Sequence, residues 1–230
     1  MKAYMTEANK IKIALYKKIF QEIKQGYIAV PELSLFSAVA DMIVVNGDIH
    51  IYEIKSKMDS LSRLESQLSR FKKCANKVTV VADEKFIPKL IELPSMNGVG
   101  IISVNNKNQL KDIREAVSRP MHIEDYLAYW TSTEIKASLR GLEGYSKLSV
   151  SNAKERLLKL VNVNELNKIT VYKLKEKYGK EFIERKKLIK EKNYEKALES
   201  RFRSMIPEQT TPLRMLPAFL FKDFNQEQNS

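Results

Sequence analysis

Two carboxylates and a lysine interrupt the apolar segment ADMIVVNGDIHIYEIKSK, which runs from Ala40 to Lys57. Asp41 stands at its start, and Glu53 and Lys55 stand near its end. Burying an unpaired charge costs several kcal/mol, so charges on apolar strands need compensation. A divalent metal ion bound by Asp41 and Glu53 beside the lysine ammonium would supply it. A salt-bridge network with Lys55 is the structural alternative.

An Asn-Gly pair in this segment predicts a β-hairpin with strands over residues 38–46 and 48–56. Side chains alternate between the faces of a strand, so the loop length decides whether the two carboxylates share a face. A two-residue loop pairs Ala40 with Glu53 and sends Asp41 to the opposite face. A three-residue loop, or one bulge, brings the carboxylates together. The metal hypothesis therefore predicts an odd-length loop or a bulge.

Helical and strand patterns alternate around this hairpin. The expected helices cover residues 6–25, 60–75, 86–93 and 109–118, and Thr6 is the expected cap of the first. The other expected strands cover residues 27–33, 77–82 and 99–104. This alternation predicts the α/β class, with a mixed central sheet flanked by helices on both faces.

The order of these features resembles the PD-(D/E)XK nuclease superfamily, in particular a poorly characterised bacterial and phage branch. The resemblance covers residues 5–118 and starts from an aspartate and a Glu-x-Lys motif on a hairpin. Gln67 and Phe71 on the following helix are similar to a glutamine-x3-tyrosine element, with phenylalanine replacing tyrosine. Ala40 stands where the superfamily often has proline. The resemblance implies a restriction-endonuclease-like core.

The resemblance also implies roles for individual residues. Asp41 and Glu53 would bind one or two Mg²⁺ or Mn²⁺ ions, with the main-chain carbonyl of Ile54 as a further ligand. Lys55 would orient the attacking water or help to deprotonate it. Gln67 would reach from its helix toward the lysine or the water. The implied activity is the metal-dependent hydrolysis of DNA phosphodiester bonds, by an endonuclease or an exonuclease.

Glu32 is the candidate for a third metal ligand, because it precedes the hairpin as an extra acidic residue does in some branches. A simple edge-strand charge is the alternative for Glu32. Glu7 and Glu22 on the first helix compete for the same acidic role. His50 has the opposite strand parity from Glu53, so we expect a packed or surface histidine there.

Composition limits the kind of site. The chain has 230 residues, of which 43% are hydrophobic, as in ordinary globular proteins. Cys74 is its one cysteine, which excludes an intramolecular disulfide and fits a reducing cytosol. With two histidines besides, a Cys/His zinc site is excluded, and oxygen ligands suit Mg²⁺ or Mn²⁺. No run of about 18 apolar residues occurs, so we expect a cytoplasmic protein without a membrane span.

The formal net charge of +12 predicts a polyanionic partner, DNA, because phosphate neutralisation supplies most non-specific nucleic-acid affinity. A lysine-rich solvated surface is the alternative. Two other functions remain open: a non-catalytic basic nucleic-acid-binding protein, and a helical adaptor for an acidic protein. A homodimer is compatible with the resemblance, since many nucleases of this superfamily act as dimers.

The chain is expected to divide into a nuclease-like core at residues 1–119, a basic helical domain at 120–206 and a C-terminal tail at 207–230. From residue 151 to 204 there are 16 Lys and Arg against 8 Asp and Glu. Helices are expected over residues 122–129, 132–139, 151–162, 165–178 and 181–205, separated by glycines at 141, 144 and 179. In the tail, the apolar run at 218–221 is expected to dock on the body of the protein, with the last polar residues disordered.

Overall fold

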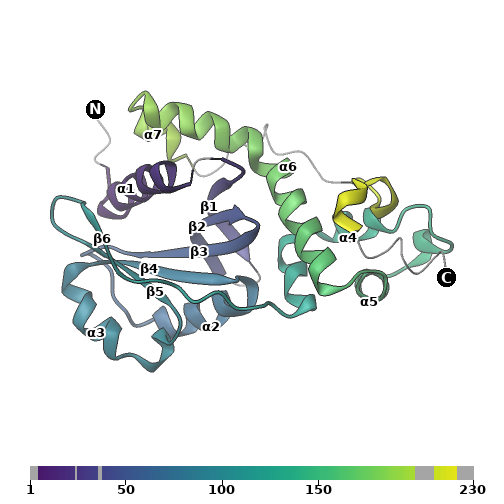
Figure 1. Ribbon diagram of the computed structural model, residues 1–230, viewed down its shortest axis with the longest axis horizontal. Coiled ribbons are helices and arrows are strands. Elements are labelled where there is room, and N and C mark those ends of the chain that lie inside the picture. The colour runs from purple at the N-terminus through teal and green to yellow at the C-terminus, as the bar shows by residue number, and fades with distance from the viewer. Residues whose placement is uncertain (1–4, 24, 36–37, 200–209, 222–230) are drawn as a thin grey trace.

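A six-stranded mixed sheet forms the centre of the computed structural model, which describes residues 5–23, 25–35, 38–199 and 210–221 (Figure 1). The strands lie in the order β1-β2-β3-β4-β5-β6. The pairs β3–β4 and β4–β5 are parallel, and the other three pairs are antiparallel. The strands are β1 (Ile28–Leu35), β2 (Ala38–Asn46), β3 (Asp48–Lys55), β4 (Lys77–Asp83), β5 (Gly100–Val104) and β6 (Leu110–Arg114). The predicted α/β class with a mixed sheet is confirmed.

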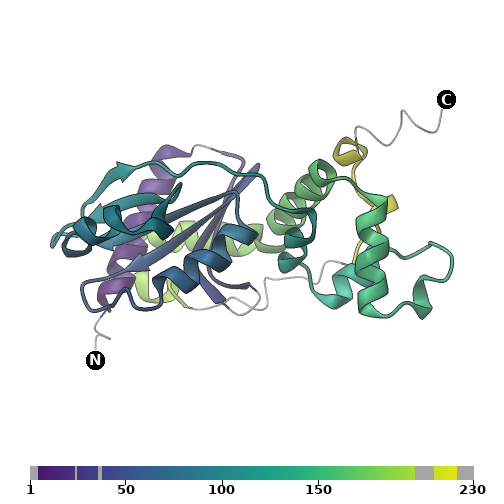
Figure 2. The same cartoon turned by 90° about the horizontal axis from the view of Figure 1, so that it is seen from below.

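Helices cover both faces of this sheet. On one face lie α1 (Glu7–Glu22), the C-terminal part of α6 (Val163–Lys190) and the short α7 (Tyr194–Ala197) (Figure 1). On the other face lie α2 (Leu64–Cys74) and α3 (Ile87–Glu92), which are nearest to the viewer in Figure 2. Parallel neighbours cannot be joined by a tight turn, so α2 and α3 serve as the crossovers from β3 to β4 and from β4 to β5.

Local sequence explains why the first helices form where they do. The side chain of Thr6 accepts a hydrogen bond from the Asn9 backbone N–H, so the predicted cap of α1 is confirmed. Leu64, Leu68 and Phe71 are fully buried at helical spacing along α2. Burying each of these side chains stabilises the fold by about 2 kcal/mol and fixes α2 against the sheet.

The helix predicted over residues 109–118 is wrong, because the segment contains the edge strand β6. It pairs antiparallel with β5, with a register irregularity between Ile101 and Ile102. The segment offers few apolar side chains for a buried helical face, since Lys111, Asp112 and Ile113 are all exposed. The open edge of β5 supplies main-chain partners that a local helical pattern does not reveal.

The break predicted at Gly179 is also wrong, because α6 runs through it. A glycine costs a helix interior about 1 kcal/mol, and packing on either side exceeds this cost. Tyr178 and Phe182 are both buried, and the Phe182 ring lies 5.1 Å from that of Tyr27. The predicted helix over 181–205 therefore starts inside α6, and its residues 200–205 lie outside the described ranges. Gly141 and Gly144 do adopt positive φ values between elements, as expected.

The second half of the chain is helical, as predicted. It contains the 3₁₀ helix η3 (Ile123–Tyr129), α4 (Ser132–Ser138), η4 (Tyr145–Lys147), α5 (Val150–Leu160) and the N-terminal part of α6. Trp130 Nε1 donates to Thr170 Oγ1 at 3.0 Å, and the Tyr129 hydroxyl donates to the Cys74 carbonyl at the end of α2. The Trp130–Thr170 bond holds the helical region together, and the Tyr129–Cys74 bond joins that region to α2.

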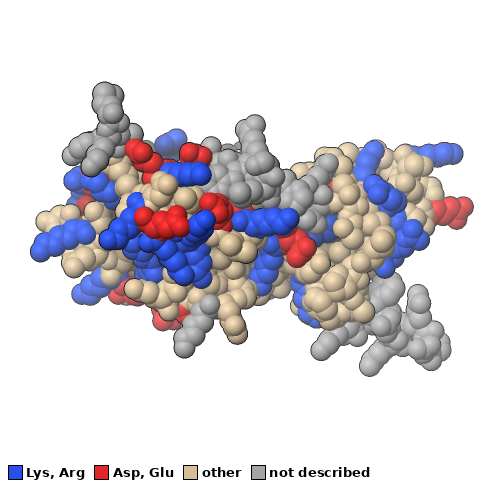
Figure 3. Space-filling model, turned by 90° about the horizontal axis from the view of Figure 1, so that it is seen from above, with Lys and Arg blue, Asp and Glu red and all other residues tan. Residues whose placement is uncertain are grey.

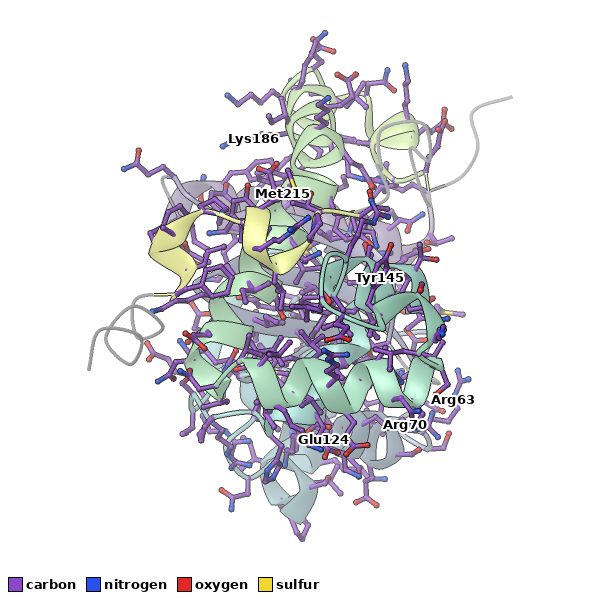
Figure 4. All side chains as sticks on the ribbon, turned by 90° about the vertical axis from the view of Figure 1, so that its right-hand side faces the viewer. Arg63, Arg70, Glu124, Tyr145, Lys186 and Met215 are labelled. Carbon is purple, nitrogen blue, oxygen red and sulfur yellow. The ribbon has the colours of Figure 1, made fainter. Side chains whose placement is uncertain are left out.

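The C-terminal apolar run docks on this helical region, as predicted. It forms the 3₁₀ helix η7 (Ala218–Phe221), in which Leu220 is buried and the Phe219 ring lies 6.4 Å from that of Tyr172. The predicted disorder of the last residues lies outside the described ranges. Figure 4 looks onto this end of the molecule, with Lys186 high in the view and Arg63 and Arg70 low. Among the described helices, none is long and apolar enough to cross a membrane.

His50 is a packed histidine, as its strand parity suggested. Its Nε2 lies 2.8 Å from Thr79 Oγ1, and its ring stacks on Tyr52 with centroids 4.1 Å apart. Burial, helped by the charge of Lys77, lowers the pKa of His50 from 6.5 to about 3. The imidazole is therefore neutral in the folded protein near neutral pH.

We predict that His50 makes the fold sensitive to acid. Below pH 6.5 the unfolded chain protonates His50 and the folded chain does not, so the contribution of His50 to stability falls as pH falls, by at most about 1.4 kcal/mol per pH unit, whatever other groups contribute. Urea unfolding at about pH 7.5 and about pH 5.5 measures the loss. His50→Gln should show a smaller loss than wild type, whereas His122→Gln, at an exposed site, should match wild type. Equal losses in all three proteins would contradict the prediction.

Candidate active site

The turn between β2 and β3 has the odd length that the metal hypothesis requires. Asn46 pairs with Asp48 across the turn, and the register continues without a shift as far as Met42 and Tyr52. Gly47 alone lies between the paired residues, at φ 85°, a left-handed conformation that glycine adopts without strain. The predicted odd-length loop is confirmed, and it decides which side chains share a face of the sheet.

Continued by one pair, this register sets Asp41 on β2 opposite Glu53 on β3, with both side chains on one face. Directly opposed residues on antiparallel strands have Cβ atoms about 5 Å apart. One carboxylate oxygen of Asp41 accepts a hydrogen bond from the Ile54 N–H at 2.7 Å. The main chain beside Glu53 thus fixes the Asp41 carboxylate, so the hairpin brings the two acids together.

Glu53, Lys55 and Gln67 form a closed triangle of hydrogen bonds. Lys55 Nζ donates to Glu53 Oε1 at 2.7 Å and to Gln67 Oε1 at 2.8 Å, and Gln67 Nε2 donates to Glu53 Oε1 at 2.6 Å. Glu53 is 2% exposed and Lys55 is 6% exposed. Because Gln67 comes from α2, the packing of that helix sets the position of both charged groups.

The two carboxylates resist ionisation. Burial, followed by the charge of Asp41, raises the pKa of Glu53 to about 7, against the opposing effects of Lys55 and Gln67. Burial likewise raises the pKa of Asp41, and the Ile54 N–H, Lys12 and Lys55 partly offset it. Glu53 Oε2 is buried and has no hydrogen-bond partner among the described residues. A cation bound to Glu53 Oε2 would give that oxygen a partner and would reduce the repulsion between the Asp41 and Glu53 carboxylates.

Glu32 lies one strand further out and is bound by a lysine that sequence analysis missed. The ladder pairs on either side set it opposite Asp41, yet Glu32 itself has φ 50°. Lys12 Nζ on α1 donates to Glu32 Oε1 at 2.7 Å, and Lys12 is 5% exposed. The sequence did indicate that Lys12 is buried, because helical spacing places it on the same face of α1 as Tyr16 and Ile19.

The competing acids of α1 lie in other ion pairs. Glu7 pairs with Lys10 at 2.7 Å and with Lys57 at 3.3 Å, and Glu22 pairs with Lys18 at 2.5 Å. Solvent screens partly exposed pairs of this kind, so they contribute little to stability. The structure therefore brings neither of these acids into the triangle around Glu53.

Two carboxylates and main-chain oxygen are what the site offers to a metal ion. Within the described residues, no three His, Cys, Asp or Glu side chains are grouped so that they could hold one ion together. Mg²⁺ is commonly held by one or two carboxylates, with water and substrate phosphate completing its six ligands. The Asp41–Glu53 pair, with its unpartnered Glu53 oxygen, fits that pattern.

Comparison with known proteins links the chain to phage proteins. The family model described as "Bacteriophage P4 protein cII" matches residues 1–200. Protein cII of Enterobacteria phage P4 is 27% identical over 188 residues, covering 76% of this chain and 69% of that protein. The phage part of the expected relationship is therefore confirmed.

One solved structure also matches weakly. It is the SPO1766 protein of unknown function from Silicibacter pomeroyi, with a TM-score of 0.42 and 13% sequence identity. The match covers 54% of this chain and 80% of that one. A similarity this low supports no argument about the site.

We predict that the buried ion pair is strongly coupled in the absence of metal. Lys55→Met leaves the Glu53 carboxylate buried without its cation, which should cost on the order of 3 kcal/mol of unfolding free energy. The double variant Glu53→Gln/Lys55→Met removes both charges and should recover most of that loss. Urea unfolding in EDTA at about pH 8 gives the unfolding free energies of wild type, Glu53→Gln, Lys55→Met and the double variant. A double variant no more stable than Lys55→Met would contradict this reading of the triangle.

Proposed function

The chain belongs to the bacteriophage P4 protein cII family, and we propose that this member is a metal-dependent nuclease that hydrolyses DNA phosphodiester bonds. One observation carries the proposal: the hairpin register, continued by one pair, sets Asp41 opposite Glu53, and Lys55 and Gln67 complete the site around Glu53. The element order α1-β1-β2-β3-α2-β4, with the acids on β2 and β3, supports a restriction-endonuclease-like core of the PD-(D/E)XK type.

The cofactor that suits this site is Mg²⁺, or Mn²⁺ in its place. Asp41, Glu53 and the main-chain carbonyl of Ile54 would hold it. A bound ion of this kind lowers the pKa of a water molecule and stabilises charge on the phosphoryl oxygens. The proposal leaves Glu32 outside this ligand set, because its side chain is 42% exposed and stands where β1 leaves the ladder with β2, whereas the Glu53 side chain is 3% exposed and has an unpartnered oxygen.

Lys55 is the residue that acts on the water or the phosphate. An ammonium group has three N–H donors, and Glu53 and Gln67 accept two of them. The third N–H can donate to a phosphate oxygen or orient the attacking water. The bonds to Glu53 and Gln67 fix the position of the ammonium group for this task. Gln67 is a positioning residue, since it contacts Glu53 and Lys55 and holds both at once.

DNA is the substrate that the charge distribution favours. The net charge is +12, and Lys and Arg side chains are spread over the face shown in Figure 3, interspersed with acids. A basic surface attracts the phosphate backbone without regard to sequence. A non-catalytic nucleic-acid-binding protein is the second candidate, because the Glu53–Lys55 pair could also serve as a structural ion pair.

We predict that cleavage depends on both Lys55 and the metal. Supercoiled plasmid and labelled linear DNA would be incubated with Mg²⁺, Mn²⁺ or EDTA and the purified protein. Lys55→Met should lower the cleavage rate by at least about 100-fold, the scale of a lost acid–base group. Lys57→Met is the matched control, because Lys57 stands two residues after Lys55 and is exposed. The Lys57→Met protein should cleave DNA at the wild-type rate.

Two outcomes would contradict the nuclease proposal. Cleavage by folded Lys55→Met at the wild-type rate would show that the site is elsewhere. DNA binding by wild type without cleavage in any metal would favour the non-catalytic binding protein. A circular dichroism spectrum of each variant separates loss of activity from loss of fold, which matters because Lys55 is buried.

We also predict that metal alone stabilises the fold. An ion that binds only the folded state at about 100 times its Kd adds about 2.7 kcal/mol of stability. Thermal unfolding with and without excess Mn²⁺ should show this increase for wild type and for Glu65→Gln, an exposed acid on α2. Glu53→Gln should lose it. An equal Mn²⁺ effect on Glu53→Gln and on wild type would place the bound ion away from Glu53.

A further inference from the structure

Lys12 is a buried lysine beside the acidic residues of the site. It lies on the apolar face of α1, where Leu15, Tyr16 and Ile19 are fully or almost fully buried. An ammonium group removed from water needs a counter-charge close by. Glu32 supplies one at 2.7 Å, and the Lys12 charge also acts on Asp41, where it favours the ionised carboxylate. The Lys12 charge therefore acts on two of the three acids of the site, Glu32 on β1 and Asp41 on β2.

The backbone at Glu32 carries strain at the same point. A non-glycine residue at φ 50° costs about 1 to 2 kcal/mol, and such residues gather at functional sites. Glu32 is the one position between Pro31 and Leu35 that does not join the ladder with β2. A local backbone distortion thus sets the position of its carboxylate, which forms an ion pair with Lys12.

A count of formal charges shows what Lys12 changes. The carboxylates of Glu32, Asp41 and Glu53 and the ammonium groups of Lys12 and Lys55 together leave one negative charge. One divalent ion would make the site singly positive, which complements one phosphodiester. Without Lys12, one divalent ion would only neutralise the site, and a second would be needed to attract the phosphate.

We propose that Lys12 takes the place of a second metal ion, so that this site binds one divalent ion and Glu32 is not a ligand of it. This inference rests on the proposed function, since it concerns the metal at Asp41 and Glu53. It identifies Lys12 as a positioning residue, which fixes Glu32 and supplies a positive charge beside Asp41. The number of bound ions is then a property that one side chain on α1 determines.

Metal stoichiometry in the absence of DNA tests this inference without relying on activity. Mn²⁺ would be titrated into the full chain, with bound ion counted by calorimetry and free ion by electron paramagnetic resonance. Wild type should bind one ion at the site. Lys12→Met should bind two, and Lys12→Met/Glu32→Gln should bind one again. Lys17→Met, an exposed change on the same helix with the same loss of charge, should stay at one.

Glu32→Gln supplies a second test that does not depend on the stability of Lys12→Met. It should keep one ion, with a Kd within about 3-fold of wild type, because Glu32 is not a ligand. A Kd weakened by more than about 10-fold would make Glu32 a ligand and overturn the inference. Two ions in wild type, or one ion in a folded Lys12→Met, would overturn it as well while leaving the nuclease proposal intact. No bound ion in wild type would instead contradict the proposed function itself.

Discussion

The buried ion pair between Glu53 and Lys55 is the interaction on which the rest of the site depends. Both groups are almost fully removed from water, so each is tolerated only because the other is 2.7 Å away and Gln67 bonds to both. A pair of this kind contributes little net stability compared with apolar side chains of the same size. The arrangement therefore supports the proposed catalytic role of the pair. Its remaining unpartnered oxygen, Glu53 Oε2, points to the same conclusion.

The sheet and its two helical layers are arranged so that this pair can be held. β3 lies between β2 and β4 in the sheet. Asp41 on β2 is therefore beside β3, and α2 can pack over one face of β3. α2 contributes Gln67 and is fixed by its buried apolar residues, whereas α1 contributes Lys12 on the Glu32 side. Each charged or polar group of the site therefore comes from a helix or a strand, as the proposed active site requires. All of them fall within the region that matches the family.

Much of this could be predicted from sequence, because the signals are local. The Asn-Gly turn, the apolar face of α2 and the cap at Thr6 each depend on residues within a few positions of one another. The sequence left the parity of the loop open, so the shared face of Asp41 and Glu53 followed only from the metal hypothesis until the strand register was known. β6 and the Lys12–Glu32 contact could not be predicted in this way, since they depend on partners that the chain brings close only after folding, although helical spacing does place Lys12 on the buried face of α1. The edge of β5 captures β6, and Lys12 meets Glu32 across 20 positions of sequence. The continuous α6 shows the same limit, because tertiary packing overrides a glycine in mid-helix.

The most direct test of the central claim is anomalous diffraction from crystals grown with Mn²⁺ and a short DNA duplex. Our account predicts one anomalous peak, bound by the carboxylates of Asp41 and Glu53 and facing a phosphate of the DNA. Lys55 should lie beside that phosphate or its attacking water. Mn²⁺ bound elsewhere, with the Glu53–Lys55 pair still closed and no phosphate near it, would contradict the account and leave the acidic hairpin a structural ion pair.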